Sequence, residues 1–220
     1  MLLNTIRFYI IIALFSFAAC NNDDVVGSGP TVTQTLDIAT FDELTVDGSY
    51  TISITQGDTL EVTATGQANV IDVINTSVTN QRWNLNYTVS NVESEGLRID
   101  ITIPTLSRIE SDGSADVTLG AFTAQTSFLI DLDGAGSYTV TAPWTDLESL
   151  NLSIDGSGDI DGFPFNAKDV VIDIDGSGDV DVTASDQLDI SIDGAGTVRY
   201  KGNPTITQSI SGTGEIIDAN

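Results

Sequence analysis

One short phrase recurs five times in the second half of the chain, and its spacing restricts the fold more than any other feature. Each copy contains an aliphatic residue, Asp or Ser, Gly, a small residue and Gly. The copies are Leu132–Gly136, Ile154–Gly158, Ile174–Gly178, Ile192–Gly196 and Ile210–Gly214, after a degenerate sixth at Glu110–Ala115. The first glycines stand at 113, 134, 156, 176, 194 and 212, so the steps are 21, 22, 20, 18 and 18 residues. A period near twenty residues is typical of stacked structural units.

The residues around each copy alternate between apolar and polar. From Leu150 to Ile160, Leu, Ile and Gly occupy the even positions, whereas Asn, Ser and Asp occupy the odd positions. A two-residue period places one set of side chains in a core and the other in solvent, as in a β-strand. The glycines belong to the inward set, where the chain bends and a side chain would not fit. Each copy therefore predicts a bend between two strands.

Two all-β architectures satisfy this alternation. In an antiparallel β-hairpin sandwich, each phrase is a three-residue hairpin loop. In a parallel β-helix or β-solenoid, each phrase is a bend in one coil of about 18–22 residues, and equivalent residues of successive coils lie above one another. Hairpins do not require identical loops at constant spacing, whereas stacked coils do. The spacing therefore favours the β-solenoid, with the antiparallel sandwich as the alternative.

The first half of the chain is strand-like but less regular. A divergent copy of the phrase surrounds Gly48, which lies 65 residues before Gly113, a gap that could hold three coils. No linker separates the two halves. We therefore expect one domain over 36–220, with an irregular first half at 36–105 and regular rungs at 106–220.

The start of the chain has the features of an export signal. Arg7 is followed by the apolar run Phe8–Phe17 and by Ala18, Ala19 and Cys20, the only cysteine. The run is too short to span a membrane. It predicts a signal peptide at 1–19, a lipid on Cys20 that anchors the chain to a membrane, and a flexible tether at 20–35. An ordinary signal peptide with a chance cysteine is the alternative.

Asp23 and Asp24 follow that cysteine after two asparagines. They resemble the acidic signals that send some lipoproteins to the outer surface. We expect an outer-membrane location, on the periplasmic or the surface face, with the surface face favoured.

Three segments resemble a known bacterial envelope family. They are the opening at Phe41–Gly57, the middle at Ile101–Ile109 and the serial Gly-x-Gly rungs. Together they are similar to the family called putative auto-transporter adhesin, head GIN domain, over about residues 38–216. The resemblance implies a right-handed parallel β-helix-like fold and an envelope lipoprotein. It supplies no catalytic residues.

Composition excludes several functions. The chain has 32 acidic residues, 7 basic residues and no histidine, with a net charge of −25. Such a surface repels nucleic acid and anionic lipid, so neither is expected as a partner. Without histidine, Ser-His-Asp catalysis, Cys-His catalysis and histidine-ligated zinc are excluded. The glycines lie between strands and precede no helix, so no phosphate-binding loop is predicted.

Carboxylates remain as candidate site residues. In stacked coils one outward row would contain Asp133, Asp155, Asp175 and Asp193. A second row would contain Asp116, Asp159 and Asp179, with breaks at Ser137 and Thr197, and would resume at Glu215. Neighbours about 4.8 Å apart would repel by about 0.9 kcal/mol in bulk water, which would favour bound Ca²⁺. The alternative is a solvated acidic face on which each Asp bonds the backbone of its own turn. That alternative is favoured, because the spacing of known calcium solenoids is absent.

The leading hypothesis is a non-enzymatic, lipid-anchored envelope protein with an acidic solenoid that displays or binds. The regular ladders and repeated side chains suit contact with a glycan, a cell-surface protein or further copies of the chain. The last rung has no recognisable cap, which also favours pairing between copies. Trp144, after Pro143, is the candidate ligand contact. Two alternatives stay open: a polysaccharide-processing enzyme with a carboxylate cluster, and a calcium-stabilised structural protein.

Overall fold

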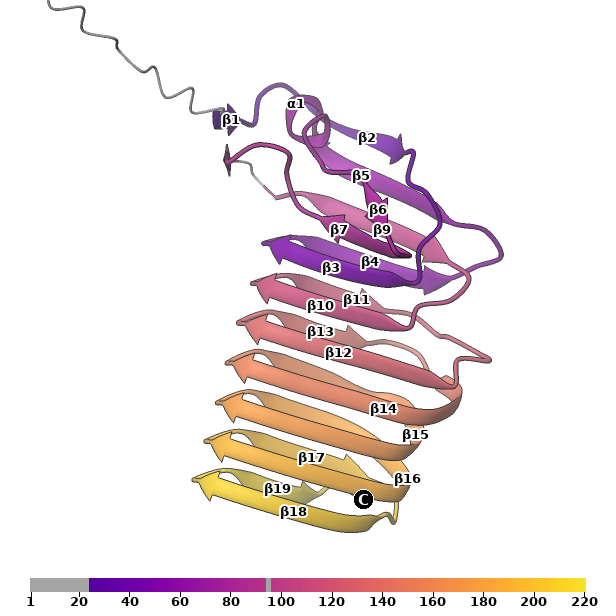
Figure 1. The fold of residues 1–220 in the computed structure, drawn as a ribbon, viewed down its shortest axis with the longest axis vertical. Helices are drawn as coiled ribbons and strands as arrows, with labels where there is room; N and C mark the ends of the chain where they lie inside the picture. Colours follow the sequence, from indigo (N-terminus) through magenta and orange to yellow (C-terminus); the bar gives the residue numbers. More distant parts are fainter. Residues whose placement is uncertain (1–23, 94–95) are drawn as a thin grey trace, which may run out of the picture.

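The computed structural model describes residues 24–93 and 96–220, and most of these residues lie in β-strands (Figure 1). The first nine strands are β1 (Asp24–Val26), β2 (Thr31–Leu36), β3 (Glu43–Gly48), β4 (Thr51–Gln56), β5 (Glu61–Gln67), β6 (Val78–Thr79), β7 (Arg82–Leu85), β8 (Asn91–Glu93) and β9 (Arg98–Ile103). The others are β10 (Arg108–Gly113), β11 (Asp116–Leu119), β12 (Ser127–Gly134), β13 (Ser137–Val140), β14 (Trp144–Gly156), β15 (Asp159–Gly176), β16 (Asp179–Gly194), β17 (Thr197–Lys201), β18 (Thr205–Gly212) and β19 (Glu215–Asp218). The helix α1 (Ala68–Ile71) has four residues. No helix in the described ranges is long and apolar enough to cross a membrane.

The regular half of the chain is a parallel β-solenoid, as predicted. The strands that precede each bend stack in the order β3, β10, β12, β14, β15, β16 and β18. Those that follow each bend, from β4 and β11 through β13 to β17 and β19, form a second stack. Every one of these pairings is parallel, so the antiparallel sandwich is wrong.

The repeated phrases lie in vertical register. Their first glycines pair in one column: Gly48, Gly113, Gly134, Gly156, Gly176, Gly194 and Gly212. The degenerate copy at Gly113 is therefore a full rung. Gly48 pairs directly with Gly113, so the expectation that three coils separate them is wrong.

The intervening residues form an insertion at the N-terminal end of the solenoid. Strand β9 pairs parallel with β4, β5 then pairs antiparallel with β9, and β2 pairs antiparallel with β5. The short β6 likewise adds antiparallel to β7. Spacing along the chain could not separate this arrangement from coils, because both contain short alternating strands.

The predicted tether at 20–35 is wrong where the structure describes it. Residues 24–26 are β1, which pairs with β8, and residues 31–36 are β2, which pairs with β5. The segment Thr31–Leu36 alternates exposed threonines with half-buried residues, a pattern that suits a strand with one face packed. The described part of the chain thus begins with a paired strand at Asp24.

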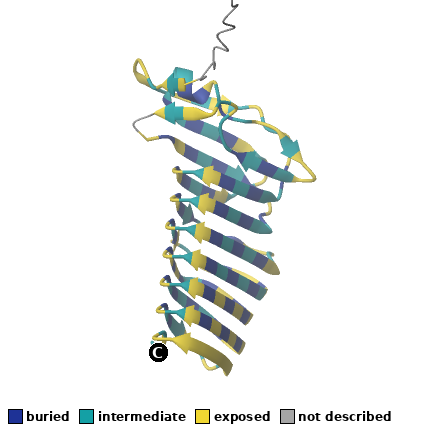
Figure 2. Cartoon of the chain, turned by 60° about the vertical axis from the view of Figure 1, so that its left-hand side comes forward, coloured by how far each residue is buried: buried dark blue, intermediate teal, exposed yellow. Residues whose placement is uncertain are grey.

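The core runs the length of the solenoid between the two stacks. Inward positions stack like on like, so that Ile154 lies between Leu132 and Ile174, and all three are buried. Figure 2 shows the resulting stripes of buried and exposed residues along each strand. Within the described ranges the one buried polar residue is Ser111, which shares a hydrogen bond of 2.5 Å with Tyr138. Burial raises the pKa of Tyr138 well above its usual value.

Candidate functional site

The bends form one continuous edge of the solenoid, which we call the turn edge. It comprises the Gly-x-Gly bends and the residues on either side of them. At Gly176 φ is +137°, and a Cβ built there would lie 2.1 Å from the carbonyl oxygen of Gly156. That same oxygen accepts a hydrogen bond of 2.8 Å from the amide of Ser177. Only glycine permits this close stacking of one bend on the next.

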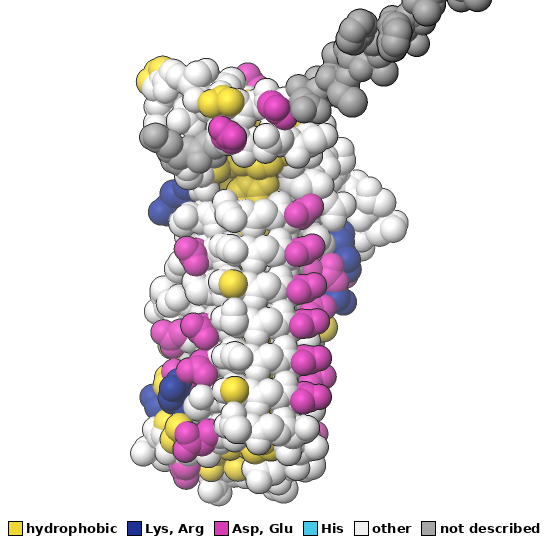
Figure 3. All heavy atoms as spheres, turned by 90° about the vertical axis from the view of Figure 1, so that its left-hand side faces the viewer, with side chains coloured by type: hydrophobic (Ala, Val, Ile, Leu, Met, Phe, Trp, Pro, Cys, Tyr) yellow, Lys and Arg dark blue, Asp and Glu magenta, His cyan; other side chains and the backbone are white. Residues whose placement is uncertain are grey.

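A column of exposed carboxylates, the first Asp row, runs along the turn edge. The predicted members Asp133, Asp155, Asp175 and Asp193 pair in register and are exposed, which confirms their stacking. The column continues at its other end through Asp112 and Asp47. Figure 3 shows this acidic column on the face formed by the bends. Sequence reasoning missed the last two members, although each directly precedes a bend glycine.

The second row has a structural task. In register it contains Asp116, Ser137 and Asp159, and beyond them Asp179, Thr197 and Glu215. An Asp159 carboxylate oxygen accepts a hydrogen bond of 3.1 Å from the amide of Asp179, and an Asp179 oxygen accepts one of 3.1 Å from the amide of Thr197. These two carboxylates thus tie together the three successive coils that contain Asp159, Asp179 and Thr197. The expectation that they bond their own turn is wrong, because their oxygens point along the solenoid axis.

The two rows do not assemble a metal centre in the ranges the structure describes. Among residues 24–93 and 96–220, no group of three or more His, Cys, Asp or Glu residues is arranged to hold a metal ion. In the first row the carboxylates are exposed and lie side by side on neighbouring strands. Bound Ca²⁺, the less favoured of the two expectations for these rows, therefore has no coordinating cluster among the described residues.

A shallow hollow of about 250 Å³ lies beside the second row. Its lining comprises Asp159, Ile160, Asp161, Asp179, Asp181 and Arg199. Arg199 lies 3.3 Å from Asp181 and 3.4 Å from Asp179, and its hydrogen bond with Asp181 raises its pKa. The guanidinium thereby neutralises part of the acidic cluster.

A larger hollow of about 560 Å³ lies at the N-terminal end of the solenoid. It is bounded by the connection from β2 to β3, by the loop after β4 and by the segment after β9. Apolar side chains of Ile38, Phe41, Leu60 and Pro104 line it, together with Asp42 and Asp58. Sequence reasoning missed it, because it is formed by segments distant along the chain.

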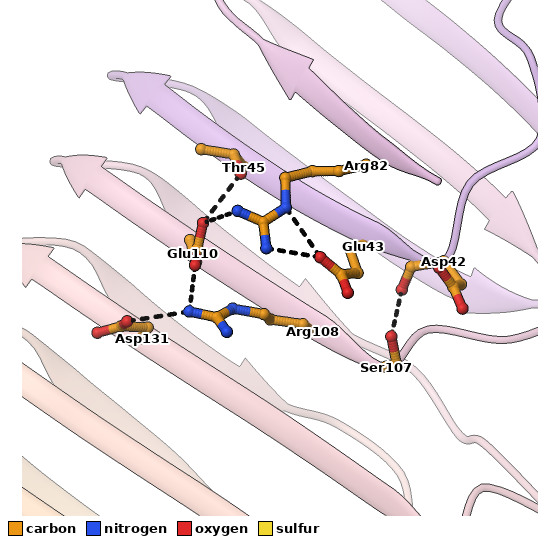
Figure 4. Close-up of polar contacts among 8 residues, drawn as sticks. All are labelled: Asp42, Glu43, Thr45, Arg82, Ser107, Arg108, Glu110 and Asp131. Atoms are coloured by element: carbon orange, nitrogen blue, oxygen red, sulfur yellow. Dashed lines mark hydrogen bonds and ion pairs between the residues drawn. The ribbon is translucent and has the colours of Figure 1, made fainter. Parts of the chain in front are cut away.

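Half-buried ion pairs join the coils on the face next to this end (Figure 4). Arg82 lies 2.6 Å from Glu43 and 2.7 Å from Glu110, which also contacts Arg108. Arg108 in turn reaches Asp131 at 3.4 Å. The hydrogen bond with Glu43 raises the pKa of Arg82. Four successive strands, β7, β3, β10 and β12, are linked in this way.

Trp144 is not a ligand contact, and that prediction is wrong. Its side chain is fully buried, and its indole nitrogen donates a hydrogen bond of 2.8 Å to the carbonyl of Gly120. The ring packs against Phe122, Phe128 and Phe165. Pro143 suggested an exposed loop, but Trp144 begins β14 and points into the core.

The predicted signal peptide at 1–19 and the predicted lipid site at Cys20 lie outside the described residues. Their place in the sequence still indicates which end of the solenoid is nearest to them. Asp24 opens β1, which lies at the same end of the solenoid as β2 and α1 (Figure 1).

Comparison with known proteins agrees with this architecture. The family model described as "Putative auto-transporter adhesin, head GIN domain" matches residues 40–148 and 127–204. A crystal structure of a putative adhesin from Bacteroides fragilis is 23% identical, covers 87% of this chain and 98% of its own, and has a TM-score of 0.71. A crystal structure of a putative lipid binding protein from Parabacteroides distasonis is 21% identical. It covers 89% of this chain and 100% of its own, and its TM-score is 0.60. No curated protein matches the sequence. At these sequence identities, the likeness to the solved structures shows a shared fold and no more.

Proposed function

We propose that this chain, which belongs to the family described as putative auto-transporter adhesin, head GIN domain, is a non-enzymatic adhesion module of the cell envelope. In this proposal the solenoid is a rigid scaffold and the turn edge is its contact surface. The partner is a glycan or a protein on a cell surface. Nucleic acid is not among the proposed partners, because a net charge of −25 opposes its binding.

The observation that carries the proposal is the alignment of the first Asp row. Six exposed carboxylates, from Asp47 to Asp193, repeat at the spacing of adjacent strands, about 4.8 Å. A partner with repeated groups can engage several rungs at once, so that individually weak contacts add. The backbone that holds the row is already ordered by the stacked coils, which lowers the entropy lost on binding.

We further propose that a lipid on Cys20 anchors the protein to the outer membrane. Because β1 starts at Asp24, the anchor would lie next to the N-terminal end of the solenoid, and β18 and β19 would project away from the membrane. Replacing Cys20 by Ser should move the protein from the membrane fraction to the soluble fraction. Retention of the Ser variant in the membrane fraction would contradict the anchor.

Adhesion through the turn edge is tested with two variants of equal charge. The first carries Asn in place of Asp133, Asp155, Asp175 and Asp193. The control carries Asn in place of four exposed Asp residues away from the turn edge: Asp169, Asp173, Asp186 and Asp189. Beads coated with each protein are counted on bacterial and host cells. The first variant should lose most of its adhesion while the control keeps it; equal adhesion of both would refute the role of the row.

A glycan-processing enzyme is the alternative, and the hollow around Asp159, Asp179 and Arg199 is where its acids would gather. The test is incubation of the protein with acidic and neutral glycans, with and without Ca²⁺. Turnover that disappears in an Asp179→Asn variant would overturn the non-enzymatic proposal. A melting temperature that falls when calcium is chelated would favour the calcium-stabilised alternative.

A further inference from the structure

The two ends of the solenoid differ. At the N-terminal end, the antiparallel strands β5 and β2 extend the second stack beyond the parallel coils, and α1 packs beside them. At the C-terminal end, within the described residues, β18 pairs only with β16 and β19 only with β17. The last coil, at the bottom of Figure 1, therefore presents an edge of backbone groups without strand partners in the described part of the chain.

The last coil exposes residues that every earlier coil buries. All eight residues of β18 are exposed (Figure 2). Ile206 and Ile210 are 36% and 40% exposed, whereas Leu188 and Ile192, on which they stack, are 0% and 1% exposed. The apolar column of the core thus ends in open apolar side chains. Covering them would gain hydrophobic free energy in proportion to the area removed from water.

Strand β18 also lacks the charges that usually protect a sheet edge. It contains no Asp, Glu, Lys, Arg or Pro, in a chain with a net charge of −25. Where β16 has Asp189 and Asp193, β18 has Thr207 and Ser211. Natural proteins commonly block exposed edges with charges, prolines or bulges, because an unblocked edge pairs with another strand. The absence of such a block at β18 indicates that this edge is used for pairing.

The sequence of β18 is self-complementary. Read outward from Gln208, the two directions carry the same types of residue: Thr207 and Ser209, then Ile206 and Ile210, then Thr205 and Ser211. In an antiparallel pair related by a two-fold axis at Gln208, each residue would oppose its own type. Hydroxyl pairs and aliphatic pairs directly opposite one another stabilise such a sheet. A two-fold dimer needs a surface that matches itself in this way.

We propose that β18 pairs antiparallel with β18 of a second copy of this chain, about a two-fold axis at Gln208. The pairing joins the first stack of the two solenoids into one sheet. It brings Ile206 of one copy against Ile210 of the other, so that the two cores become continuous. It also places the two N-terminal ends at opposite tips of the dimer. Because both copies are acidic, added salt strengthens the association by screening their repulsion.

A head-to-tail arrangement is the rival. The outermost strand at the other end, β2, reads Thr-Val-Thr-Gln-Thr-Leu, close to Thr-Ile-Thr-Gln-Ser-Ile in β18. Pairing of β2 with β18 of another copy would leave both ends of the assembly open, so it would grow into chains. A closed dimer and an open chain give different masses, and they depend on different strands.

Three matched substitutions separate these arrangements. Gln208→Glu places two carboxylates opposite each other at the two-fold axis, Gln34→Glu charges β2, and Gln187→Glu adds the same charge to an exposed position of β16. The mass of the full chain in detergent is followed by light scattering over about a hundred-fold range of concentration. We expect a dimer whose dissociation constant rises about tenfold or more in Gln208→Glu. Gln34→Glu and Gln187→Glu should dimerise like the wild type.

The other outcomes overturn the proposal. A monomer at every concentration, a dimer unaffected by Gln208→Glu, or a series of growing chains sensitive to Gln34→Glu would each do so. Gln208→Cys provides a check that does not depend on affinity, because the two thiols meet at the axis. Under mild oxidation it should yield a covalent dimer, whereas Gln187→Cys should not. An equal yield from both would refute the two-fold pairing.

Discussion

Substitution of Gly176 by alanine tests the close stacking of the bends. At this position φ is +137°, and a Cβ would lie 2.1 Å from the Gly156 carbonyl oxygen. A non-glycine residue in such a conformation is destabilising by about 1–3 kcal/mol. The contact with backbone cannot be relieved by rotating a side chain, so the coils must separate. The hydrogen bond from Ser177 to Gly156, 2.8 Å long, is then lost, which removes about 1 kcal/mol more.

The expected loss for Gly176→Ala is therefore about 3 kcal/mol, or about 6–12 °C in melting temperature for a domain of this size. The matched control is Gly29→Ala. Its φ is +84°, but a Cβ there meets nothing within 4 Å, so it carries only the backbone strain. Both variants are measured by chemical denaturation monitored by circular dichroism. If Gly176→Ala is no less stable than Gly29→Ala, close stacking of the bends does not contribute to stability.

Further predictions concern side chains. Glu110→Gln should destabilise the fold by about 1 kcal/mol, because it weakens the contacts that hold Arg82 and Arg108, whereas Lys168→Ala, in an exposed pair, should leave the denaturation midpoint unchanged. Ser111→Ala and Tyr138→Phe should each lower the free energy of unfolding by about 1–2 kcal/mol, and the double variant should lose less than the sum of the two single losses. Additive losses in this double-mutant cycle would contradict the buried hydrogen bond. Because the pKa of Tyr138 is raised in the folded state, its proton is lost first from the unfolded chain, so stability should be full below about pH 10 and fall above it. Tyr138→Phe should reduce that alkaline slope; an unchanged slope would assign it to another group. Asp155→Asn should raise stability by about 2 kcal/mol at low salt, because its repulsion by Asp133 and by Asp175 is removed, and the gain should fade as salt is added; a gain that persists in high salt would not be electrostatic.

The sequence determined the repeating part of the fold. Alternation assigns each side chain to the core or to solvent, and constant spacing requires that like residues stack. These two local properties were enough to predict parallel coils, the glycine column and the row from Asp133 to Asp193, all of which the structure has.

Other features depended on pairings that alternation cannot specify. Short alternating strands are compatible with either direction of pairing, so the antiparallel β5 and β2 could not be told from further coils. The hollow near Phe41 arises from segments far apart along the chain. Trp144 was misplaced because burial is set by the aromatic side chains that surround it in space, not by the proline before it.

The sequence by itself therefore settled the repeat, the inward and outward faces and the family. Only the tertiary structure decided which end of the solenoid is covered, because that depends on the long-range pairing of β9 with β4. It also decided that the second Asp row bonds the next coil and that the first row stands free in solvent. The physical reason is that spacing fixes which residues share a column, while the direction of each side chain within it depends on the neighbours it meets in space.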